Sequence, residues 1–194
     1  MSPSLALLRI PSALSPVDGS RAEEARRRPA VPAAVDALRQ QLRSLRDLVA
    51  GLAGEVYEAT PSPASGSIGQ HVRHCVDHGT ALVAAASRIE FSYDSRIRGT
   101  RVEIDPAAAV IEIDRLCLQL DEYDARSLDR PLWLRTLTHV DGPQLRVATT
   151  MGREVAFVLQ HTVHHAALIA VLLDAQGLAV PPRFGYAPST PART

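Results

Sequence analysis

The stretch Gln160-His161-Thr162-Val163-His164-His165 places three imidazoles inside an apolar run that extends from Val155 to Leu173. A run of this length without glycine or proline predicts a helix that is buried on most of its faces. His161 and His165 are four residues apart, so on a helix their side chains leave the same face about 6 Å apart along the axis. Two imidazoles at this spacing can bind one metal ion, which would explain polar rings in a core helix.

A second group of histidines supports this interpretation. His71, His74 and His78 follow one another at steps of three and four, after a capping-box pattern at Ser67-Ile68-Gly69-Gln70 that predicts a helix start. If this helix packs beside the later one, imidazoles from both can surround one ion. The alternative is that each histidine is a core residue hydrogen-bonded to a carbonyl or a carboxylate. The paired spacing and the second group of histidines favour the metal.

Other polar residues near the pair have less specific interpretations. Glu154 lies seven residues before His161, two turns away on the same face, and is the candidate catalytic residue, as a proton shuttle or as a group that orients a ligand. Its alternative role is a favourable charge in the first turn of the helix. Asp77 could accept a histidine N–H or face water. His164 is off the shared face and is expected to pack or support a neighbour, and His139 is expected to be exposed.

The remaining pattern predicts an all-α domain. An amphipathic helix begins near Pro32, a second begins at Ser67 and fades near Tyr93, a third has Asp105 as its cap, and the last spans residues 150–176. Residues 132–140 and 145–149, joined through an Asp-Gly-Pro turn, predict a small β-hairpin before the last helix. We therefore expect a flexible leader over residues 1–31, a four-helix bundle over residues 32–180 and an irregular tail over residues 181–194. The two aromatic residues of the tail, Phe184 and Tyr186, are expected to fold back onto the bundle.

Composition narrows the possible partners and the compartment. The chain has 194 residues, 46% of them hydrophobic, and a formal net charge of zero, which suits one core and gives no excess of cations for binding nucleic acid. Its two cysteines, Cys75 and Cys117, fall in helical apolar patterns and are expected to be reduced core thiols. No signal peptide and no charge-free segment of about 20 residues stands out, so we expect a cytoplasmic protein that does not bind membranes. The expected partner is a small-molecule substrate, and a homodimer is left open.

Two motifs carry a resemblance to a known family. With Ser67-Ile68-Gly69-Gln70-His71-Val72-Arg73-His74-Cys75-Val76-Asp77-His78 and His161-Thr162-Val163-His164-His165, the chain resembles the DinB-like family, also described as DinB/YfiT-like metalloenzymes. The resemblance covers roughly residues 32–177. It implies a four-helix bundle in which one histidine of the second helix and a His-x-x-x-His pair of the last helix bind a divalent metal. On this sequence these ligands are His74, His161 and His165, with His71 as the alternative to His74.

The resemblance also implies a class of reaction. Members of the family include thiol-dependent S-transferases and isomerases that use mycothiol, bacillithiol or glutathione. The expected cofactors are therefore a divalent ion (zinc, nickel or iron) and a low-molecular-weight thiol, and the expected activity is transfer of a thiol or water to an electrophilic small molecule. A related branch of the family, the iron-dependent sulfoxide synthases, carries the pattern His-x-x-x-His-x-Glu. Residue 167, where that glutamate would stand, is alanine here, which argues against this branch. A non-catalytic metal-binding bundle and a metal-free interaction module are the alternatives.

Overall fold

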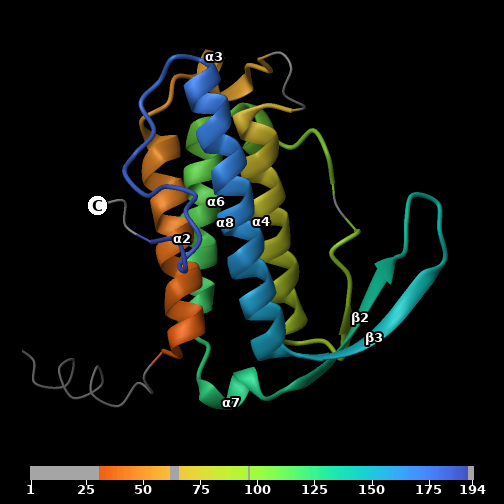
Figure 1. The fold of residues 1–194 in the computed structure, drawn as a ribbon. Coiled ribbons are helices and arrows are strands. Elements are labelled where there is room, and N and C mark those ends of the chain that lie inside the picture. The colour runs from red at the N-terminus through yellow and green to blue at the C-terminus, as the bar shows by residue number, and fades with distance from the viewer. Residues whose placement is uncertain (1–30, 62–65, 96, 192–194) are drawn as a thin grey trace, which may run out of the picture. The chain divides into compact units, whose positions relative to one another are not determined.

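Four long helices pack side by side in the computed structural model, which describes residues 31–61, 66–95 and 97–191. They are α2 (Ala33–Ala50), α4 (Ile68–Ala85), α6 (Pro106–Leu120) and α8 (Met151–Ala175), as Figure 1 shows. Helices α2 and α4 each contact both α6 and α8, so the four helices form a closed bundle with α4 beside α8. This confirms the predicted four-helix architecture. The predicted leader falls on residues 1–30, which lie outside the described residues, and on Val31.

Local capping interactions fix where these helices begin. The Ser67 side chain accepts a hydrogen bond from the backbone N–H of Gln70, whose side chain accepts one from the N–H of Ser67, which completes the capping box. Asp105 caps α6, with proline at the first helical position. The Thr150 side chain accepts from the N–H of Arg153 at the start of α8. Each start lies within one residue of its predicted position.

The core is the apolar stripe of each helix turned inward. In α2, the five residues spaced by three and four are fully buried, namely Val35, Leu38, Leu42, Leu45 and Val49. In α4, Ile68, Val72, Cys75 and Leu82 are also fully buried, and Val83 packs against the core in part. Cys75 and Cys117 are buried free thiols, as predicted. Of the described helices, α8 is the one long and apolar enough to cross a membrane, and here it packs against α2 and α4.

A small sheet extends from one end of the bundle (Figure 1). Strands β2 (Pro131–Leu137) and β3 (Gln144–Thr150) pair antiparallel and form the predicted hairpin. A third strand, β1 (Glu90–Phe91), pairs parallel with β2 and gives the order β1-β2-β3. Strand β1 was not predicted, because two residues are too few to show an alternation of polar and apolar side chains.

Two expectations were wrong in detail. Helix α4 ends at Ala85 and not near Tyr93, because the Arg130 guanidinium donates hydrogen bonds to the carbonyls of Ala86 and Arg88 and the chain then enters β1. In the tail, Phe184 is buried, but Tyr186 is 49% exposed. Short helices complete the connections, namely α3 (Gly54–Glu58), α5 (Arg101–Ile104) and α7 (Ala125–Leu128).

Candidate metal centre

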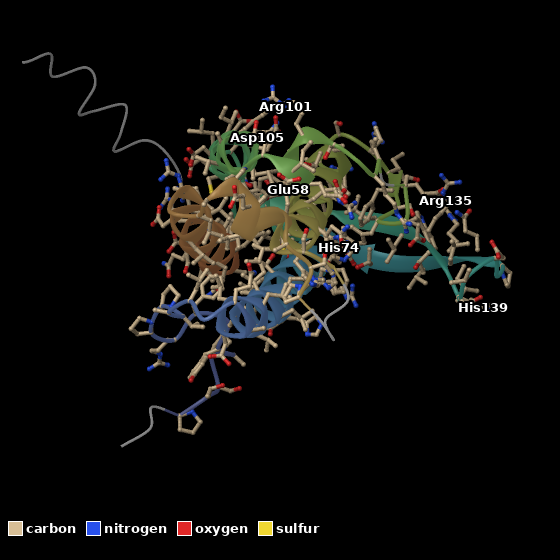
Figure 2. All side chains as sticks on the ribbon, turned by 90° about the horizontal axis from the view of Figure 1, so that it is seen from above. Glu58, His74, Arg101, Asp105, Arg135 and His139 are labelled. Carbon is tan, nitrogen blue, oxygen red and sulfur yellow. The ribbon has the colours of Figure 1, made fainter. Side chains whose placement is uncertain are left out.

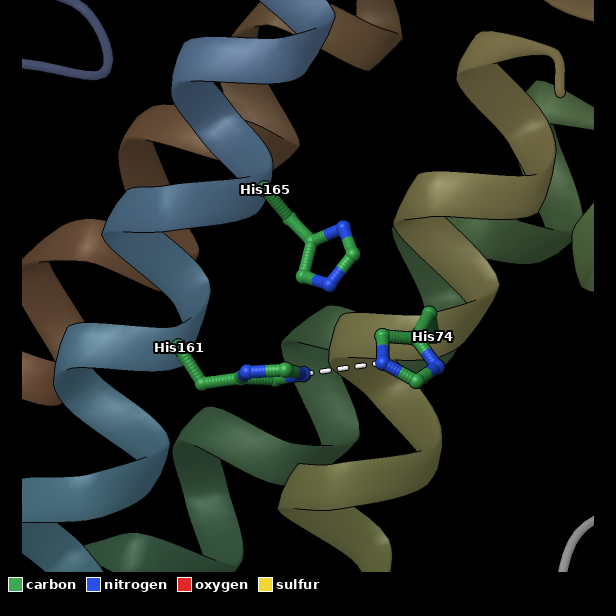
Figure 3. Close-up of side chains that lie close together, drawn as sticks. All are labelled: His74, His161 and His165. Carbon is green, nitrogen blue, oxygen red and sulfur yellow. Dashed lines mark hydrogen bonds between the residues drawn. The ribbon is translucent and has the colours of Figure 1, made fainter. Parts of the chain in front are cut away.

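Three imidazoles converge between α4 and α8. His74 comes from α4, and His161 and His165 come from successive turns of α8 (Figure 3). The Nε2 atoms of His74 and His161 lie 2.8 Å apart. One ring nitrogen from each of the three residues can be chosen so that all three atoms lie within 4.8 Å of one another. The structure therefore brings together the three residues expected from the sequence.

This arrangement fits a divalent ion. Zinc–imidazole bonds of about 2.0–2.1 Å in a tetrahedral site place ligand nitrogens about 3.3 Å apart, so the three rings need only small shifts to share an ion. Imidazole suits zinc, nickel and iron, and a set of three leaves at least one coordination position for another ligand. All three histidines are partly exposed, so part of the cluster faces solvent. The cluster could bind a metal with an open face.

His71 contacts His165 but is not a member of this group of three. The Nδ1 atoms of His71 and His165 are 2.9 Å apart, which is a hydrogen bond in which one ring donates and the other accepts. With Nδ1 facing His71, the nitrogen of His165 that points toward His74 and His161 in Figure 3 is Nε2. The geometry therefore favours His74 over His71 as the α4 member of the cluster.

Aromatic side chains line the cluster on the side toward the N-terminus of α8. His78 is buried, and its Nδ1–H donates to the carbonyl oxygen of His74 over 2.9 Å. The phenol ring of Tyr93 stacks on His78, with ring centres 4.9 Å apart and planes 12° apart. Phe157 stacks on His161 at 5.5 Å and 21°. Tyr93 and Phe157 were not singled out from the sequence, although Phe157 lies four residues before His161, the spacing of helical neighbours.

Glu154 is fully buried and surrounded by donors. Its Oε2 accepts a hydrogen bond from the hydroxyl of Tyr93 at 3.0 Å. Its Oε1 accepts from the hydroxyl of Thr149 at 2.6 Å and from the guanidinium of Arg153 at 2.9 Å. These bonds link Glu154 to the histidine cluster through the Tyr93 ring that stacks on His78.

Burial favours the neutral forms of His71, Cys75 and His165. Desolvation, with the neighbouring His161 and His71, lowers the pKa of His165 to about 3. Desolvation also lowers the pKa of His71. Neutral imidazole is the form that binds metals, so no proton has to leave His165 when an ion binds near neutral pH. Burial raises the pKa of the Cys75 thiol to about 12, so this residue does not supply a thiolate.

The other polar residues considered from the sequence lie outside the cluster. His164 is exposed on α8, and His139 is exposed on the hairpin, well away from His74 in Figure 2. Asp77 accepts a hydrogen bond from the guanidinium of Arg73 at 3.0 Å. Arg73 and Asp77 therefore form an ion pair along α4.

Comparison with known proteins agrees with the family expected from the sequence. The model of the DinB superfamily matches residues 37–169, a span that contains all three histidines of the cluster. The chain is also 37% identical over 100 residues to FK506-binding protein 5 of Rhizopus delemar. That match covers 51% of this chain but only 26% of the fungal protein, so it concerns about a quarter of that protein. Because the family model matches more than half of this chain, the chain belongs to the DinB superfamily.

Proposed function

We propose that this protein is a divalent-metal-dependent enzyme that transfers a small thiol, or water, to an electrophilic small molecule. The observation that supports this most strongly is the partly exposed cluster of His74, His161 and His165. A closed structural site usually has four protein ligands, whereas three ligands and a solvent-facing side are typical of a catalytic site. A divalent ion held there would lower the pKa of a coordinated thiol or water toward neutrality.

The protein's own residues would perform the remaining tasks. His161 and His165 hold fixed positions because they project from successive turns of one buried helix, and His74 is fixed by the packing of α4 on α8. Phe157 covers one face of the His161 ring and shields it from water. Cys75 is a protonated core thiol in this proposal, so the sulfur nucleophile comes from the bound small molecule.

For Glu154 we propose a positioning role. Its carboxylate accepts hydrogen bonds from three side chains, and one of them, Tyr93, stacks on His78. His78 in turn donates to the backbone carbonyl of His74. Glu154 thus supports the inner side of the cluster through Tyr93. This corresponds to the orienting role considered from the sequence, as distinct from the proton shuttle.

The proposal is tested by metal content together with a screen for activity. Protein purified without chelators is compared with His161→Ala and with His139→Ala, which removes an exposed histidine of the hairpin. We expect metal in the unmodified protein and in His139→Ala, and loss of metal in His161→Ala. Transfer of a thiol to electrophiles is expected only in the unmodified protein and in His139→Ala. Metal without any activity or exchangeable water ligand would support the non-catalytic bundle instead.

A further inference from the structure

His71 is one turn before His74 on α4 and its ring contacts His165 of α8, yet it is not one of the three histidines that could together hold an ion. Its Nδ1 lies 2.9 Å from the Nδ1 of His165, and the two ring centres are 5.1 Å apart. The contact joins α4 and α8 directly and is not a surface pair, because both rings are only partly exposed. A histidine pair in this position needs an explanation beyond packing.

The geometry assigns to His71 the role of a positioning residue: it accepts the Nδ1–H of His165 and leaves Nε2 of His165 to bind the metal. This inference rests on the proposed metal site. Neutral imidazole carries its single proton on one nitrogen, so an acceptor at Nδ1 selects the form whose lone pair is on Nε2. The hydrogen bond also fixes the rotation of the ring about its bond to the backbone.

The same geometry excludes His71 as a fourth ligand in this arrangement. The nitrogen of His165 that faces His71 is Nδ1, so an ion bound between His71 and His165 would lie on the Nδ1 side of the His165 ring, away from His74 and His161. Nε2 instead points toward His74 and His161 (Figure 3). Partners of this kind, which hydrogen-bond to a ligand without touching the ion, typically change metal affinity by about 10–100-fold when removed.

The test measures zinc affinity by competition with a chromogenic chelator in four proteins: unmodified, His71→Ala, His71→Asn and His164→Ala. Asparagine can place an amide oxygen near the position of Nδ1 and so restores an acceptor. His164→Ala is the matched control, because it removes an exposed histidine beside His165. We expect His71→Ala to bind one zinc with about 10–100-fold lower affinity, His71→Asn to recover part of the loss and His164→Ala to bind as the unmodified protein does.

Two spectroscopic measurements distinguish positioning from direct coordination. In the zinc-loaded unmodified protein, nitrogen NMR of the imidazoles should show the proton of His165 on Nδ1 and the metal on Nε2. The cobalt-substituted His71→Ala protein should keep the absorption spectrum of the unmodified protein, since the ligand set is unchanged. A proton on Nε2, a changed cobalt spectrum, or equal zinc affinity in a folded His71→Ala would overturn the assignment. If the unmodified protein bound no metal at all, the proposed function itself would fail.

Discussion

Replacing Glu154 with glutamine changes one buried carboxylate into an amide of the same size. The carboxylate accepts from Tyr93 on one oxygen and from Thr149 and Arg153 on the other, and Glu154 is 0% exposed. An amide has one oxygen and one NH₂ group, so it can accept on one side only and places a donor against a donor on the other. The substitution therefore disrupts at least one hydrogen bond to a charged group.

The expected cost follows from that count. A hydrogen bond to a charged group contributes about 1.5–3 kcal/mol, so we expect Glu154→Gln to lower the free energy of unfolding by about 2 kcal/mol. For a domain of this size that corresponds to a fall in melting temperature of about 4–8 °C. Tyr93→Phe removes one donor and should cost less. The double variant should lose less than the sum, with a coupling of about 0.5–3 kcal/mol, since both residues share one hydrogen bond.

The assay is urea denaturation followed by circular dichroism, with zinc content measured on the same samples. Glu122→Gln, at an exposed glutamate, is the matched control and should stay within about 0.5 kcal/mol of the unmodified protein. Zinc stoichiometry should be unchanged in Glu154→Gln, because the three histidines are intact. If Glu154→Gln were as stable as the control, the buried hydrogen bonds of Glu154 would not stabilise the fold.

Further outcomes follow from packing, protonation and ligand binding. Gly69→Ala would place a Cβ 2.0 Å from the backbone oxygen of Glu103, and the resulting strain of about 1–3 kcal/mol should exceed the helix-propensity gain of about 1 kcal/mol. The control is Gly54→Ala, whose Cβ meets no atom within 4 Å, and urea titration measures the free energy of unfolding of both variants. Equal changes in the two variants would contradict the predicted clash. Because the pKa of His165 falls to about 3 on folding, the unfolded chain binds its proton first, and the stability of metal-free protein should decline as the pH falls below about 6.5. An unchanged pH dependence in His165→Gln would refute that origin. Zinc at about a hundredfold excess over its dissociation constant should add about 2.7 kcal/mol and raise the melting temperature by about 5–11 °C, and a shift just as large in His161→Ala would contradict binding at this cluster.

The sequence predicted the parts of the fold that depend on local pattern. Helices with long apolar stripes and clear caps, such as those that begin at Ser67 and Asp105, appear within one residue of the predicted position. The pair His161 and His165 could be placed on one face because helical spacing alone decides it. His74 needed the family resemblance, since spacing on α4 left His71 equally available.

The structural features that could not be predicted from the sequence depend on contacts between distant segments. After α4 the chain enters β1, which pairs with β2, and the carbonyls of Ala86 and Arg88 accept from Arg130, more than 40 residues away in the chain. The hydrogen bond of His71 to His165 and the stacking of Tyr93 on His78 arise only when α4, α8 and the segment that follows α4 come together. Helical spacing placed Glu154 on the face of His161, but the three donors that surround its carboxylate could not be predicted. They come from the hairpin (Thr149), from the segment after α4 (Tyr93) and from the neighbouring Arg153.

Elemental analysis of the purified protein, with His161→Ala and His139→Ala prepared in parallel, tests most directly whether His74, His161 and His165 bind a metal. We predict about one divalent ion per chain in the unmodified protein and in His139→Ala, and almost none in His161→Ala. Equal and negligible zinc, nickel, iron and manganese in all three proteins, before and after incubation with each metal, would contradict it.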